Sequence, residues 1–257
     1  MTGLSERPVV LARSASSILQ MFLSIQASDA TPAPFHQEPF AVSRGQIVGP
    51  VACASDANQS YVLYLPSNYT PERRWPILYA FDPPARGRLA VEIFQEAAEK
   101  YGYIVAGSNN SRNVPWEPSL ASIRAMWTDT HARFSLDERQ VYTTGFSGGA
   151  RVAVSMVRGL PGEVAGVTAC GAGFRLATAQ RPSRDTPFVF FATVGIRDFN
   201  FSELPGLDKT LTNLRLTHRV KVFNGGHQWP PKELAAEALE WMEIQAMKSG
   251  RCDKITP

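Results

Sequence analysis

The chain has 257 residues, of which 44% are hydrophobic and 19% charged, and its formal net charge is +3. This length and composition fit one globular domain with its own core, and they exclude an intrinsically disordered or collagen-like chain. The weak positive balance, without a Lys/Arg-rich run, predicts no nucleic-acid partner. No apolar run reaches the ~20 residues needed to cross a bilayer, so no membrane span is expected.

The beginning of the chain differs from the rest. We expect residues 1–40 to be a leader and linker, and residues 41–257 to be the folded domain. Arg7 and Arg13 precede a short apolar stretch, Ile18–Ile25, which is typical of a secretory signal peptide. Two polar residues interrupt this stretch, so a leader without fixed structure is the alternative. The first interpretation places the protein in the periplasm or outside the cell, and the second leaves it in the cytoplasm.

From residue 45 onward, short apolar strands alternate with helical patterns. Strands are expected at Gln46–Val51, Tyr61–Leu65, Pro76–Phe81, Tyr103–Ala106, Val141–Thr144, Ala165–Cys170, Phe188–Val194 and Val220–Phe223. Helices are expected at Leu89–Lys100, Pro118–Phe134, from Gly149 through Val157, Leu207–Leu216 and Lys232–Met247. The apolar runs PILYAF and FVFFATV are typical of strands buried on both faces. The alternation predicts an α/β fold with a mostly parallel central sheet and helices on both faces.

Five residues after the Val141–Thr144 strand match the pattern G-x-S-x-G, in GFSGG at 145–149. A strand before this motif and a helix after it form the setting in which it presents a nucleophilic serine. The flanking glycines avoid collisions in the sharp turn, and the Gly148 N–H is expected to be one oxyanion donor. Phe146 is expected to contact substrate. The alternative is that Ser147 merely caps the helix.

A serine nucleophile needs a base, and the chain has four histidines. His227 follows the last expected strand in the loop NGGHQWPP, at the carboxyl end where sites of parallel sheets lie. His36 falls in the linker and His131 inside a helix. His218 begins a strand, which places it at the opposite edge. We therefore expect His227 to be the base.

The base needs an acid that orients it. Asp198, in GIRDFN, is the only carboxylate directly after the FVFFATV strand, and it would hold the imidazole in the required tautomer. Asp185 precedes that strand, and Asp208 belongs to the following helix. The resulting order along the chain is serine, aspartate, histidine.

The motifs GFSGG, GIRD and GGHQWP resemble the α/β-hydrolase esterase branch that includes polyhydroxybutyrate depolymerases and feruloyl esterases. This resemblance implies an α/β-hydrolase fold and a catalytic triad of Ser147, Asp198 and His227. Trp229 matches the tryptophan that follows the histidine in that branch. It would either wall the substrate pocket or pack under the loop.

One loop departs from the branch, whose members usually carry HG after the third strand. This chain has FDPPARG at 81–87, and its two prolines have no N–H to donate. The second oxyanion donor must then be Asp82, Ala85 or another group. The polar segment GSNNSRN follows the YIVA strand at the same edge, so Asn109 or Asn110 is expected to line the site or to donate from its amide. The alternative for either residue is a place in a polar turn without a role in the site.

The remaining features bound the function. The span Gly171–Pro187 is too short for a large cap domain, which predicts an open site. Cys170 is expected in the core, whereas pairing of Cys53 with Cys252 is left open. We expect hydrolysis of small-molecule or polymeric carboxylic esters, without metal or organic cofactor. A peptidase or thioesterase with the same triad and a non-catalytic binding module are the alternatives.

Overall fold

The computed structural model describes residues 42–113, 116–173 and 188–252. The leader, His36, Asp185 and most of the short span that was expected to exclude a cap domain lie outside these residues. In the described part, no helix is both long and apolar enough to cross a membrane.

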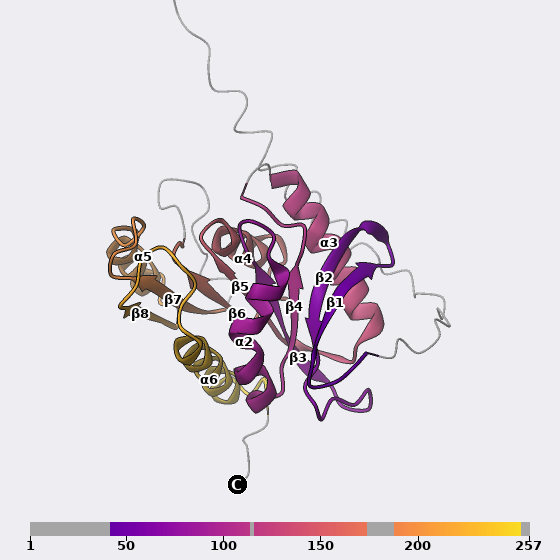
Figure 1. Cartoon of the computed structure of the whole chain (residues 1–257). Helices are drawn as coiled ribbons and strands as arrows, with labels where there is room; N and C mark the ends of the chain where they lie inside the picture. Colours follow the sequence, from indigo (N-terminus) through magenta and orange to yellow (C-terminus); the bar gives the residue numbers. More distant parts are fainter. Residues whose placement is uncertain (1–41, 114–115, 174–187, 253–257) are drawn as a thin grey trace, which may run out of the picture. The chain divides into compact units, whose positions relative to one another are not determined.

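A mixed eight-stranded sheet lies at the centre, in the order β1-β2-β4-β3-β5-β6-β7-β8 (Figure 1). The strands are β1 (Ile47–Cys53), β2 (Asp56–Tyr64), β3 (Trp75–Phe81), β4 (Ile104–Ser108), β5 (Leu136–Phe146), β6 (Gly166–Cys170), β7 (Val189–Gly195) and β8 (His218–Phe223). β1 and β2 form an antiparallel pair, and β2 is antiparallel to β4. The strands β3 to β8 are parallel to one another, so the predicted mostly parallel sheet is confirmed.

Five helices are described: α2 (Gly87–Tyr101), α3 (Trp116–Arg133), α4 (Gly148–Gly159), α5 (Glu203–Asn213) and α6 (Lys232–Lys248). β3 shows how they cover the sheet, because successive side chains of a strand point to opposite faces. Leu78 and Ala80 join a core with buried residues of α2 and α6. Tyr79 points the other way and stacks on Trp127 of α3, with ring centroids 5.5 Å apart. These contacts place helices on both faces of the sheet, as predicted. Figure 1 shows α2 and α6 side by side.

Among the described helices, α5 differs most from its predicted span. We expected Leu207–Leu216, but α5 covers Glu203–Asn213. The helix ends because Arg215 adopts a left-handed φ of 56°, and the Leu216 N–H then donates back to the Leu211 carbonyl oxygen at 3.0 Å. The turn, and not the helix, therefore brings the Leu216 side chain into the core. Apolar spacing does not separate these two cases, so it placed the C-terminus of α5 three residues too far along the chain.

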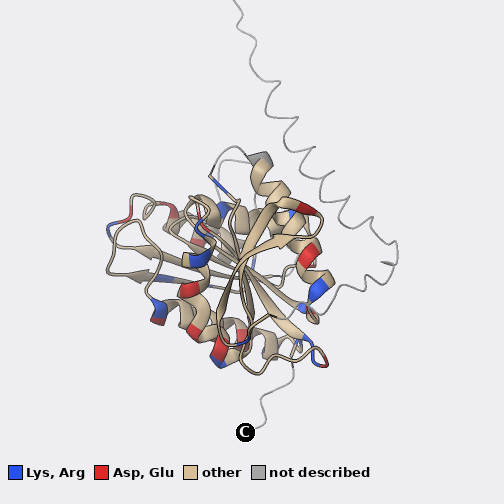
Figure 2. Cartoon of the chain, turned by 45° about the vertical axis from the view of Figure 1, so that its right-hand side comes forward, with Lys and Arg blue, Asp and Glu red and all other residues tan. Residues whose placement is uncertain are grey.

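The three thiols differ in accessibility. Cys53 and Cys170 are buried, Cys252 is half-buried, and none forms a disulfide. Burial raises the pKa of both the Cys53 and the Cys170 thiol to about 12. Positions of Lys and Arg and positions of Asp and Glu are interspersed along the helices and loops in view in Figure 2.

We expect iodoacetamide at pH 8 to alkylate Cys252 in the native protein and to leave Cys53 and Cys170 unmodified. The thiolate is the reactive form, and raised pKa values keep the two buried thiols protonated at this pH. Peptide mass spectrometry before and after guanidinium denaturation measures this. Alkylation of Cys170 in the native protein would contradict it.

Candidate active site

Three loops meet at the carboxyl edge of the parallel strands. Ser147 follows β5, Asp198 lies in the loop after β7, and His227 lies in the loop after β8. In an open parallel sheet, this edge is where binding sites form. The topology therefore brings together three side chains that are far apart in the sequence.

Ser147 lies in the turn between β5 and α4, with φ 52° and ψ −117°. Non-glycine residues rarely adopt such a backbone conformation, and strain of this kind concentrates at functional sites. The Ser147 N–H donates to the Cys170 carbonyl oxygen at 2.8 Å. Its side chain makes no helix-capping hydrogen bond, which excludes the helix-capping alternative.

Two glycines make room for this turn. A Cβ on Gly145 would collide with the carbonyl group of Gly149, and a Cβ on Gly149 would collide with the carbonyl group of Phe81. A Cβ on Gly149 would also lie 3.2 Å from the backbone nitrogen of Asp82. The start of α4 is thus packed directly against the end of β3.

A continuous series of hydrogen bonds joins the three side chains. His227 Nε2 lies 2.9 Å from Ser147 Oγ, and His227 Nδ1 lies 2.8 Å from Asp198 Oδ1. Asp198 is 5% exposed, and its Oδ1 also accepts the Asn200 N–H at 2.8 Å. A carboxylate only accepts hydrogen bonds, so His227 Nδ1 is the donor to Asp198. His227 Nε2 is then the acceptor of a hydrogen bond from the serine hydroxyl.

Two aromatic rings enclose the imidazole of His227. The ring centroid of Phe146 lies 4.6 Å from it, and that of Phe199 lies 4.0 Å from it. Phe146 is buried, with 6% exposure, whereas Phe199 is 73% exposed. Phe146 thus supports the imidazole from below, and Phe199 covers it from the solvent side.

The structure places Trp229 under the loop, corresponding to the packing alternative. The indole is buried, packs on Phe146 with centroids 5.8 Å apart, and donates from Nε1 to Asp82 Oδ1 at 2.8 Å. The same carboxylate accepts from Arg86 Nε at 2.8 Å and from Arg86 Nη2 at 3.0 Å. These hydrogen bonds raise the pKa of Arg86. Asp82 therefore ties the loop after β3 to the histidine loop.

The loop after β3 uses most of its own N–H groups. The Ala85 N–H donates to the Asp82 carbonyl oxygen at 2.9 Å, and Ala85 has a φ of 64°. The Arg86 N–H faces Asp82 Oδ2 at 3.3 Å. The Ala85 N–H is therefore not an oxyanion donor, and the two prolines of the loop have no N–H. Within this loop, the Asp82 N–H remains as the candidate donor.

The two predicted asparagines face β2 and not the serine. Asn110 accepts the Ser60 N–H at 2.8 Å and donates to the Asn58 carbonyl oxygen at 3.0 Å. Asn109 donates to Ser60 Oγ at 3.2 Å. Both amides therefore pair with the neighbouring strand.

A third amide of the same segment, that of Asn113, reaches the serine turn. The sequence did not single out this residue. The side chain of Asn113 occupies the space where a Cβ on Gly148 would be. The turn that carries it is held by Ser119, which accepts the Arg112 N–H at 3.0 Å and donates to the Arg112 carbonyl oxygen at 2.8 Å. The density of amides in GSNNSRN was the available signal, but it did not identify which amide points inward.

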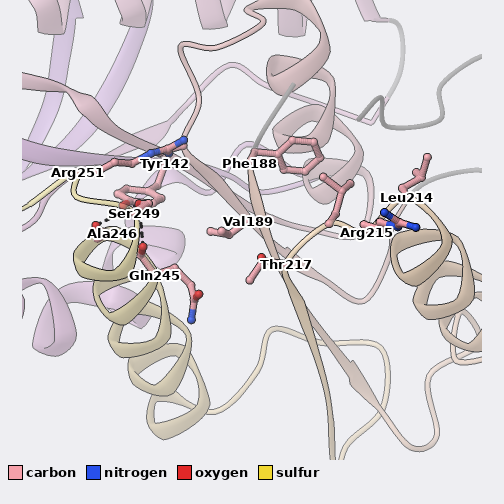
Figure 3. A pocket seen from close by; sticks show the side chains of 12 residues that line it. Tyr142, Phe188, Val189, Leu214, Arg215, Thr217, Gln245, Ala246, Ser249 and Arg251 are labelled. Atoms are coloured by element: carbon pink, nitrogen blue, oxygen red, sulfur yellow. Dashed lines mark hydrogen bonds between the residues drawn. The ribbon is translucent and has the colours of Figure 1, made fainter. Parts of the chain in front are cut away.

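Other polar and hollow features lie apart from the three loops. His131 stacks on Trp127 in α3, and His218 contacts Asp208 at the start of β8. A cavity of about 250 Å³ lies at the amino ends of β6, β7 and β8, where Val189 and Thr217 separate α5 from α6 (Figure 3). Among the described residues, no group of three His, Cys, Asp or Glu side chains could hold a metal ion.

Comparison with known proteins supports the architecture. No family model and no curated protein sequence matches the chain. An S-formylglutathione hydrolase from Staphylococcus aureus aligns over 72% of this chain and 90% of its own, with 12% identity and a TM-score of 0.58. A ferulic acid esterase aligns over 72% and 91%, with 15% identity and a TM-score of 0.55.

The chain has the α/β-hydrolase fold. The α/β-hydrolase fold is also shared with the dipeptidyl peptidase 4 of Porphyromonas gingivalis, which aligns over 77% of this chain and 35% of its own, with 15% identity and a TM-score of 0.57. The resemblance to esterases drawn from the three motifs is confirmed at the level of the α/β-hydrolase fold. Esterases and a peptidase are thus both among the proteins that share this fold.

We expect Gly149→Ala to lower the free energy of unfolding by about 3 kcal/mol, because the added Cβ would force α4 away from β3. Chemical denaturation followed by circular dichroism measures this. Gly226→Ala is the matched control, since nothing lies within 4 Å of a Cβ there. Equal stability of the two variants would show that the turn is not tightly packed on β3.

Proposed function

We propose that this chain is a serine hydrolase that cleaves carboxylic esters, with Ser147 as nucleophile. The observation that carries the proposal is the series of hydrogen bonds from Ser147 through His227 to Asp198. It starts at a strained turn at the N-terminus of α4, where backbone N–H groups favour developing negative charge.

The proposed reaction follows from the directions of the hydrogen bonds between Ser147, His227 and Asp198. Ser147 Oγ attacks the ester carbonyl carbon while its proton passes to His227 Nε2. Asp198 stabilises the imidazolium through Nδ1. The imidazolium then donates its proton to the alcohol oxygen as the carbon–oxygen bond breaks, which leaves an acyl-Ser147. A water molecule then attacks the acyl carbonyl carbon while its proton passes to His227 Nε2, and the imidazolium returns a proton to Ser147 as the acid is released. No cofactor takes part.

The oxyanion needs at least two donors, and Gly148 is the first. Its N–H opens α4 directly after the nucleophile, the position that supplies one donor in this motif. Asn113 is our candidate for the second, because its side-chain amide lies against Gly148. Its Oδ1 is the nearest atom there, so the proposal requires the amide to turn about its last bond and present the Nδ2 end, which donates two hydrogen bonds. The Asp82 N–H is the competing candidate.

We expect a fluorophosphonate probe to label the wild-type chain and not Ser147→Ala, because only an activated serine reacts. Gel fluorescence measures labelling, and circular dichroism shows whether the variant is folded. Ser155 on α4 supplies a control: its hydroxyl is bonded to the Val152 carbonyl oxygen, so Ser155→Ala should label as wild type. No labelling of the wild type would favour the non-catalytic binding module.

We expect Asn113→Ala to lower kcat by about 10²-fold with little change in KM, since an oxyanion donor acts in the transition state. Steady-state hydrolysis of p-nitrophenyl acetate measures both. Asn110→Ala is the control, because its amide pairs with β2. An unchanged kcat in Asn113→Ala would assign the second donor to the Asp82 N–H.

The likeness to a dipeptidyl peptidase keeps amide hydrolysis as a second candidate, and thioester hydrolysis uses the same groups. A panel of ester, thioester and amide substrates with one common acyl group separates them. Faster turnover of the amide than of the ester would overturn the ester assignment while leaving Ser147 as nucleophile.

A further inference from the structure

Three of the five exposed large apolar side chains of the described residues lie in one loop beside the candidate site. Within the described residues the five are Ile196 at 57%, Phe199 at 73%, Phe201 at 37%, Val222 at 50% and Ile244 at 38% exposure. The first three belong to a six-residue segment, 196–201, which also contains Asp198. We call this segment the apolar rim. Apolar groups concentrated in this way on a surface usually mark a binding site.

The backbone of the apolar rim is firmly held. The Ile196 N–H donates to the Phe223 carbonyl oxygen and the Arg197 N–H to that of Gly225, both at 2.9 Å. The Asn200 amide donates to the Gly171 carbonyl oxygen at 2.7 Å. The exposure of these side chains therefore belongs to a built surface and is not the result of a loose loop.

Phe199 defines which part of a substrate the apolar rim faces. Its ring lies on the imidazole of His227, with centroids 4.0 Å apart and planes at 37°. In the proposed mechanism this imidazole hands its proton to the departing alcohol oxygen, so the alcohol group must leave beside His227. The oxyanion donors, Gly148 and either Asn113 or Asp82, hold the carbonyl oxygen instead.

We propose that the apolar rim binds the alcohol part of the ester, with Phe199 as the main contact, and that favoured substrates carry an apolar, aryl-bearing alcohol. This inference rests on the proposed function. An aromatic side chain supplies a large apolar surface and ring stacking to such a group. A second copy of the chain is the other occupant that would cover these residues.

The test compares ethyl acetate with 2-phenylethyl acetate, whose alcohols are both primary and differ mainly in apolar surface. We expect the wild-type chain to prefer 2-phenylethyl acetate at least tenfold in kcat/KM, in the range that apolar contacts supply. In Phe199→Ala the ratio of the two kcat/KM values should fall about tenfold. Ile244→Ala on α6 removes an exposed apolar side chain elsewhere and should keep the wild-type ratio.

Each outcome decides the proposal. Equal losses for both esters in Phe199→Ala would overturn it, because the ring would then only support His227. A wild-type chain without preference for the phenylethyl ester would also overturn it. A concentration-dependent dimer that Phe199→Ala dissociates, with the ester ratio unchanged, would assign the apolar rim to a second copy. Absence of all ester hydrolysis and of fluorophosphonate labelling would instead defeat the proposed function, and this inference with it.

Discussion

The strained backbone of Ser147 is the constraint around which the candidate site is organised. A φ of 52° at a serine costs free energy that the surrounding structure must offset. The offset comes from packing: Gly145 against Gly149, and Gly149 against Phe81 at the end of β3. Because α4 is held so closely, the Gly148 N–H, the serine hydroxyl and the loop after β3 are placed together by one set of contacts.

Asp82 gives the unusual FDPP loop a structural role. Its carboxylate is fully buried and accepts from Arg86 and from Trp229, and a buried charge that is hydrogen-bonded in this way is stable. The loop is therefore organised by a side chain, whose hydrogen bonds reach both its own end and the histidine loop. The same carboxylate fixes Trp229, which lies two residues after His227 and packs on Phe146.

The sequence predicted what depends on local pattern and on strand order. Apolar runs such as PILYAF became buried strands because both of their faces are covered. Ser147, Asp198 and His227 could be named in advance, since each follows a parallel strand and such strands end at one edge. Their hydrogen-bonded arrangement agrees with that expectation, while their catalytic roles stay a proposal.

What escaped prediction depends on contacts between distant residues. Asn113, rather than Asn109 or Asn110, faces Gly148 because Ser119 holds the preceding turn. The end of α5 depends on the left-handed Arg215. The burial of Trp229 depends on Asp82, which lies 147 residues away along the chain. Neither spacing nor composition carries that information.

The position of β8 has a consequence for how activity would be lost. β8 is the last strand in the order of the described sheet and pairs there with β7 alone, whereas β5, which leads to Ser147, has a partner on each side. Pairing at a sheet edge opens at a lower free energy than pairing in the centre. The proposed base thus follows an edge strand, and the proposed nucleophile follows a strand with a partner on each side. We therefore expect the proposed activity to be lost on heating while most of the sheet is still folded.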